Sequence, residues 1–283
     1  MTKRVLRPVL YSLLLILFTV VFTALNFPQD RVSAYVDEWI KSRAGDRITA
    51  ETARVGLPLS LHVSKIQLDS EGRKIPLGDL VIKPGIVSLF RSEKSLSALL
   101  KGSWGSLPFS LEMGRENWVL DLKGNDIDLS RLPAVETMPV NLEGVLAIQA
   151  HLDGSSQDQA EWAGNGSIHL TDVRLSGNLL DMVGVGILNL SDVRLPWSAR
   201  ENLVTLKETD VAGDIMGKAA GTILVNPGSV ENSRLSLTLD LRPSLEARDR
   251  IGPLLSLLGS NSGPENGVSV KVRGTLGQPK LSL

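Results

Sequence analysis

Hydrophobic residues recur at every second position over most of the chain after residue 46. The clearest runs are Leu235, Leu237, Leu239 and Leu241, and Val268, Val270 and Val272. Similar alternation occurs over residues 57–63, 109–113, 118–122, 146–152 and 168–175. Such alternation predicts strands with one apolar and one polar face. Clusters of Gly, Asn, Asp and Pro separate the runs, so we expect an antiparallel meander and a mainly β domain over residues 46–283.

Several of these runs change phase partway along, always by the same step. Leu170 is followed by Val173, and Leu190 by Val193, within the near-identical segments LTDVRL and LSDVRL. Val63 and Ile66 repeat the step. One extra residue in a β-bulge would return the apolar side chains to one face and bend the strand, and a tight turn is the alternative. We therefore expect a curved, repetitive antiparallel sheet, in which Asp172 and Asp192 stabilise the bulges by bonding to backbone groups.

Helical patterns are few. Residues 29–45 form an amphipathic pattern with Val32, Tyr35, Val36, Trp39 and Ile40 on one stripe. Tyr35 and Trp39 are candidates for a membrane interface, where amphipathic rings are favoured, and the alternative is that the stripe covers one end of the β domain. Residues 92–101 and 245–258 are the remaining helix candidates.

The N-terminus predicts a membrane anchor. Residues 8–28 contain no charged side chain, and Lys3, Arg4 and Arg7 precede them. About 20 such residues span the hydrocarbon core of a bilayer, whereas a signal peptide, the alternative, has a shorter apolar run. The basic tail, residues 1–7, is expected to stay in the cytoplasm, which places the rest of this single-pass protein outside it.

The composition limits the classes of partner that the protein is expected to bind. The chain has 30 basic and 31 acidic residues, which argues against nucleic acid, and it has no cysteine. Only 4% of residues are aromatic, so the apolar strand faces are mainly aliphatic. Such a face would be buried under itself, under a helix or under a lipid chain. The candidate ligand-facing residues are Leu235, Leu237, Leu239, Val268, Val270 and Val272.

No pattern of catalytic residues is present in the sequence. His62, His151 and His169 are widely spaced and fall on polar strand positions. Asp126 and Asp128 alternate within a turn-like segment, but a calcium site would need further oxygen ligands. We therefore expect no catalytic residue, no metal and no cofactor, and a function that is not enzymatic.

The layout resembles the general secretion pathway protein N family of bacterial type II secretion. The resemblance rests on the basic tail, the anchor, the helix and the β pattern. Residues 268–281, a strand followed by Gly274-Thr275-Leu276 and then Pro279-Lys280, are similar to the endings of AsmA-like periplasmic proteins. The resemblance implies a curved AsmA-like sheet, an inner-membrane location with a periplasmic domain, and type II secretion components as partners. It implies no catalytic residues.

Two functions follow as expectations. The first is an anchored, non-enzymatic accessory role in type II protein secretion, through protein contacts in the envelope. The alternative is AsmA-like binding or transfer of lipid, with phospholipid held on an aliphatic concave face. An open apolar groove would favour lipid, and a closed sandwich would favour protein contacts.

Overall fold

A computed structural model describes residues 29–44, 48–56, 60–70, 73–85, 88, 92–133, 135, 140–155, 157, 162–182, 184–226, 229, 232–251 and 268–282. The tail and anchor predicted for residues 1–28 lie outside the described residues. None of the described helices is long and apolar enough to cross a bilayer.

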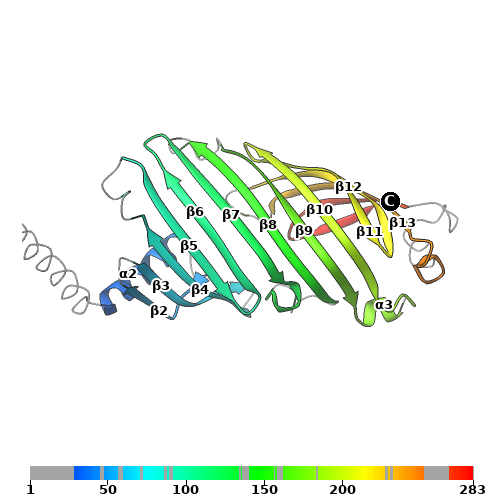
Figure 1. Ribbon diagram of the computed structural model, residues 1–283, viewed down its shortest axis with the longest axis horizontal. Helices are drawn as coiled ribbons and strands as arrows, with labels where there is room; N and C mark the ends of the chain where they lie inside the picture. Colours follow the sequence, from blue (N-terminus) through cyan, green and yellow to red (C-terminus); the bar gives the residue numbers. More distant parts are fainter. Residues whose placement is uncertain are drawn as a thin grey trace, which may run out of the picture.

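The structure is mainly β, as the alternating pattern predicts (Figure 1). The helical elements are α2 (Gln29–Ala44), η3 (Leu129–Arg131) and α3 (Asn178–Met182). The strands are β1 (Ile48–Thr49), β2 (Thr52–Gly56), β3 (Ser60–Ser70), β4 (Arg73–Pro84), β5 (Lys94–Gly102), β6 (Gly105–Met113), β7 (Asn117–Asp128), β8 (Asn141–Ser155), β9 (Trp162–Ser176), β10 (Leu188–Arg200), β11 (Leu203–Gly213), β12 (Ile215–Leu224), β13 (Arg234–Pro243), β14 (Val268–Thr275) and β15 (Pro279–Ser282).

All of these strands belong to one 15-stranded antiparallel sheet. From β3 to β15 each strand pairs with the next one in sequence, and β1 and β2 both pair with β3 at the first edge. The predicted meander is therefore confirmed. Figure 1 shows β5 to β10 running diagonally side by side, while the C-terminal strands turn away behind β10, so the sheet is curved along its length.

The phase steps of the sequence are bulges in the structure. The pairing of β3 with β4 shifts between Val63 and Ile66, and the pairing of β10 with β11 shifts between Leu190 and Asp192. Lys65 and Asp172 have φ of 53° and 51° at their bulges, a left-handed conformation that non-glycine residues rarely adopt. Because the bulges correct the phase, Ile66 on β3 and Val63 before it are both buried.

Glycines with positive φ stand on the strands that face these bulges. Gly78, with φ of 118°, is opposite Ile66, and a Cβ on Gly144 would lie 3.0 Å from the Thr171 carbonyl beside Asp172. Register shifts occur between β3 and β4, between β7 and β8, between β8 and β9, and between β10 and β11. A bulge bends its strand and increases the twist, so these bulges contribute to the curvature of the sheet.

The bulges are stabilised by carboxylates other than those predicted. The Lys65 N–H donates to Asp79 Oδ1 at 2.8 Å, and the Asn189 N–H donates to Asp214 Oδ2 at 2.8 Å. The carboxylate of Asp192 instead lies 2.6 Å from His169 Nε2 on the neighbouring strand. Asp79 and Asp214 each directly follow a glycine that faces a bulge, Gly78 and Gly213. Each carboxylate bonds to a bulge on the neighbouring strand, and the local sequence does not reveal this contact between strands.

Two of the three helix predictions differ from the structure or are only partly described by it. Residues 94–102 form strand β5, so the helix expected at residues 92–101 is wrong. Leu96, Ala98 and Leu100 share one face of this strand and pair with apolar residues on both neighbouring strands, which favours the strand over a helix. The helix expected at residues 245–258 is confirmed only at residues 248–251, and residues 252–267 lie outside the described part.

Two apolar clusters cover the ends of the sheet. At the first end, α2 reaches the cluster of Ala53, Val63 and Ile66 through Val36. At the other end, Ile251 is fully buried among Val185, Val268, Val270 and several side chains of β9 to β13. Both clusters lie on the same face of the sheet, which the register identifies as its apolar face.

Candidate functional site: an apolar face along the sheet

One row of directly paired residues crosses the sheet from β3 to β14 without a polar side chain. Each residue of the row is the register partner of the next: Leu61, Ile82, Ala98, Phe109, Leu122, Ala150, Gly166, Trp197, Leu206, Gly221, Leu237 and Val272. We call this the central apolar row. Twelve strands at about 4.8 Å spacing give it a length of about 50 Å.

The central apolar row is not covered by a second layer in the described part of the chain. Its members are half-buried, apart from Ala98, which is 4% exposed. The two end clusters involve α2 and the segment around Ile251, and no described element packs over the middle of the row. The surface between the ends is therefore open and apolar.

Glycines let large side chains spread across this surface. A Cβ on Gly166 would lie 2.5 Å from the Trp197 ring, and a Cβ on Gly164 would lie 2.4 Å from a Leu152 methyl. The same holds for Gly221 beneath Leu237, at 2.8 Å. Small residues on one strand thus make room for the ring or methyl groups of the next, and the result is a nearly continuous hydrocarbon surface.

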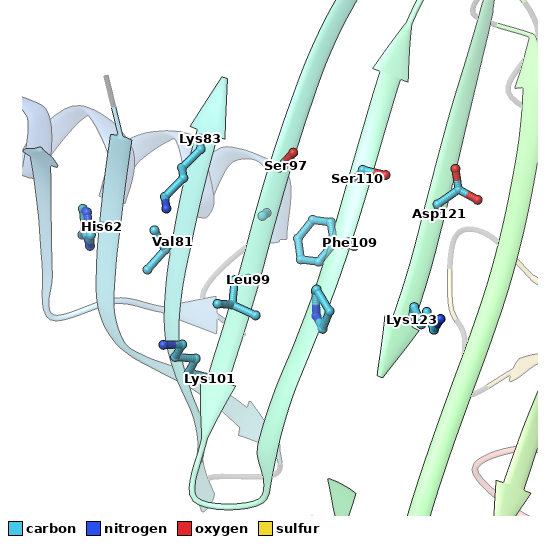
Figure 2. A pocket seen from close by; sticks show the side chains of 12 residues that line it. His62, Val81, Lys83, Ser97, Leu99, Lys101, Phe109, Ser110, Asp121 and Lys123 are labelled. Atoms are coloured by element: carbon cyan, nitrogen blue, oxygen red, sulfur yellow. The ribbon is translucent and has the colours of Figure 1, made fainter. Parts of the chain in front are cut away.

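The opposite face of the sheet is polar. A hollow of about 620 Å³ lies on it over β3 to β7, with Lys83 and Lys101 near Val81 and Leu99, and Lys123 further along on β7 (Figure 2). His62 also lines this hollow, and its Nε2 lies 3.0 Å from Ser60 Oγ. The hollow combines cationic and apolar groups with the carboxylate of Asp121.

The histidine and aspartate candidates of the sequence occupy structural positions in the sheet. His151 Nδ1 lies 2.7 Å from Asp121 Oδ1 on the neighbouring strand, and this hydrogen bond raises the pKa of His151. Asp128 accepts hydrogen bonds from the N–H and hydroxyl of Ser130 at the start of η3, and the hydroxyl bond is the main cause that lowers the pKa of Asp128. Asp126 has φ of 54° at a bulge. No cluster of potential metal ligands occurs among the described residues.

The candidate ligand-facing residues all lie on the apolar face, but they divide into two groups. Leu235, Leu237, Leu239 and Val272 are half-buried, although Leu239 packs against the Ile251 cluster. Val268 and Val270 are 5% and 4% exposed within that cluster, so they are covered by the protein itself. The open part of the predicted surface is therefore centred on the pair Leu237 and Val272.

The side chains on the apolar stripe of α2 also fall into two groups, one packed on the sheet and one exposed. Val36 packs against the first end of the sheet, and Ser33 Oγ accepts a hydrogen bond from the Ala53 N–H at 3.2 Å. Tyr35 and Trp39 are 69% and 55% exposed on the outer side of the helix. The covering role predicted as the alternative thus applies to Val36, while the two rings are free to meet a membrane interface.

Sequence reasoning missed the middle of the surface. Phe109 and Leu122 lie in runs recognised as strands, Trp197 lies just beyond the recognised run of β10, and Leu206 lies in a strand that was not singled out. Alternation identifies which side chains share a face of one strand. It does not give the register that places these four residues in one row.

No protein-family model, curated protein or solved structure matches this chain.

Proposed function

We propose that this protein binds the acyl chains of a lipid, such as a phospholipid, along the apolar face of its sheet. The observation that carries the proposal is the central apolar row, half-buried and about 50 Å long at the usual strand spacing. A half-buried apolar surface of this extent, with no described layer over its middle, is the kind of surface that marks a binding site. Acyl chains are its natural occupants because they are long, flexible and aliphatic.

The free energy gained by burying methylene groups favours acyl chains as the occupant of this surface. Burying one CH₂ group contributes about 0.8 kcal/mol, so ten buried methylenes contribute about 8 kcal/mol before the entropic costs of binding. The row is also longer than the roughly 30 Å hydrocarbon core of a bilayer, so it provides room for more than one chain or for movement of a chain along it. No polar side chain interrupts the row to stop such movement.

The arrangement of the chain supports the membrane as the source of the lipid. Helix α2 directly follows the predicted anchor and packs on the first end of the sheet. In our proposal the anchor holds this end at the inner membrane, with the β domain in the periplasm. Tyr35 and Trp39 would then rest at the interface, and lipid would reach the apolar face near β3.

Photo-crosslinking tests the proposal directly. A photoreactive residue at Leu237 or Phe109 in the full chain, expressed in bacterial cells, is expected to capture phospholipid. The matched controls are Thr238 and Ser110, the next residues on the same strands, which point to the polar face. Absence of lipid adducts at both apolar positions, or equal adducts on the two faces, would refute lipid binding along this surface.

An accessory role in type II secretion through protein contacts is the second candidate. It is supported by the resemblance in layout and by Met182 and Leu245, which are 83% and 80% exposed at the α3 end of the sheet. Deletion of the gene should then reduce secretion of folded exoproteins, and Met182→Asp with Leu245→Asp should do the same while lipid capture at Leu237 persists. Unchanged secretion in the deletion strain would exclude this role.

A further inference from the structure

The last three strands carry more basic than acidic residues on the polar face. Their basic residues are Arg234, Arg242, Lys271, Arg273 and Lys280, and their one acidic residue is Asp240. The register places all six on the same face. The whole chain, in contrast, has 30 basic and 31 acidic residues, so this charge is local.

Two of these cations face one another at the edge of the sheet. Arg273 on β14 and Lys280 on β15 are direct register partners, and both are exposed. Like charges directly opposite on neighbouring strands destabilise a sheet. The arrangement therefore costs stability in the isolated protein, and an anionic group beside Lys280 would remove that cost.

The outer edge of β15 has backbone groups available for pairing. Within the described residues, β15 pairs only with β14. Thr275 and Gln278 exchange both backbone hydrogen bonds across the connecting turn. Because such pairs alternate in an antiparallel ladder, the backbone of Lys280 points to β14 and the N–H and C=O of Leu281 point outward. Pro279 lies at the other outward position, where its missing N–H does not disturb the sheet.

We propose that β15 accepts an additional β-strand from a partner protein, and that this strand alternates acidic and apolar residues. A residue beside Lys280 would lie on the polar face near Arg273, where a carboxylate is favoured. A residue beside Leu281 would continue the apolar face. Strand addition of this kind takes affinity from main-chain hydrogen bonds and specificity from alternate side chains.

The same charges disfavour a second copy of this chain as the partner. Two β15 edges paired together would bring two Lys280 side chains close to each other. The opposite edge of the sheet carries Arg54 on the polar face of β2, so head-to-tail pairing would bring a further positive charge to the edge that carries Lys280. Both arrangements add repulsion, whereas an acidic strand removes it.

The test uses fluorescent peptides and the full chain in lipid nanodiscs, with empty nanodiscs as the blank. A short peptide alternating Glu and Val is expected to bind, as measured by fluorescence anisotropy, and a peptide alternating Lys and Val is not. The double variant Arg273→Glu and Lys280→Glu should reverse this preference. Failure of the Glu–Val peptide to bind, or equal binding of both peptides, would overturn the proposal.

A second variant separates edge pairing from adsorption of the peptide on the apolar face. Leu281→Pro removes the outward N–H and should weaken binding about three- to ten-fold, the value of one hydrogen bond. Leu281→Ala keeps that N–H and is the matched control. Lipid capture at Leu237 should persist in both variants. Equal peptide binding by the proline and alanine variants would show that the peptide does not pair with β15.

Discussion

Replacement of Gly78 by alanine tests the steric role of the glycine that faces the bulge of β3. Gly78 has φ of 118°, and a Cβ there would lie 1.9 Å from the Lys101 carbonyl oxygen and 2.7 Å from its carbon. Neither atom is the end of a flexible side chain, so the backbone of β5 must move. We expect a cost from the backbone conformation of about 1–2 kcal/mol and a further 1–3 kcal/mol from the displacement.

Gly184 is the matched control for this variant. Its φ of 76° also favours glycine, but nothing lies within 4 Å of the Cβ position. Gly184→Ala should therefore lose only the conformational part, about 1–2 kcal/mol. The measurement is the free energy of unfolding in urea, followed by circular dichroism of the full chain in detergent micelles. Equal losses in the two variants, or no loss in Gly78→Ala, would refute the steric argument.

Two further predictions concern single side chains. His151 should titrate at a raised pKa in an NMR titration, and Asp121→Asn should return that pKa towards its ordinary value. The free energy that this pair contributes to folding is fully present below the ordinary histidine pKa. It is lost as the pH rises through the raised pKa. A pKa that does not respond to Asp121→Asn would contradict the assignment. Ile251→Ala should cost about 2–5 kcal/mol of unfolding free energy, since Ile251 is fully buried, whereas Leu245→Ala, 80% exposed, should cost little; equal effects in urea denaturation would argue against the Ile251 cluster.

Much of this fold follows from local patterns in the sequence. Alternation and turn residues predict the antiparallel meander, because a strand with one apolar face has that periodicity wherever it pairs. The bulge at Val63 and Ile66 is predictable for the same reason, since a phase step is a local feature. The strand at residues 94–102 was missed because a short apolar run of Leu and Ala fits a helix as well as a strand.

The candidate site is harder to predict because it depends on register. Leu237 and Val272 were recognised as apolar positions, but the pairing that aligns them with Trp197 and Phe109 joins residues far apart in the chain. Whether a side chain on the apolar face is covered by other parts of the protein also depends on tertiary packing. Val270 has the same alternation as Val272, and only the packing of Ile251 makes one of them buried and the other half-buried.

The apolar face also bears on why the sheet does not simply fold onto itself. A sheet of this width could bury its apolar face by packing against another sheet. That packing requires bulky side chains that interdigitate across about 10 Å. The central apolar row instead mixes large residues such as Phe109 and Trp197 with Ala98, Ala150, Gly166 and Gly221, and the chain has few aromatic residues. The large side chains spread over the small residues and leave a shallow surface, which thin, flexible acyl chains fit better than a second sheet. The composition of the row therefore favours lipid over self-association as its cover.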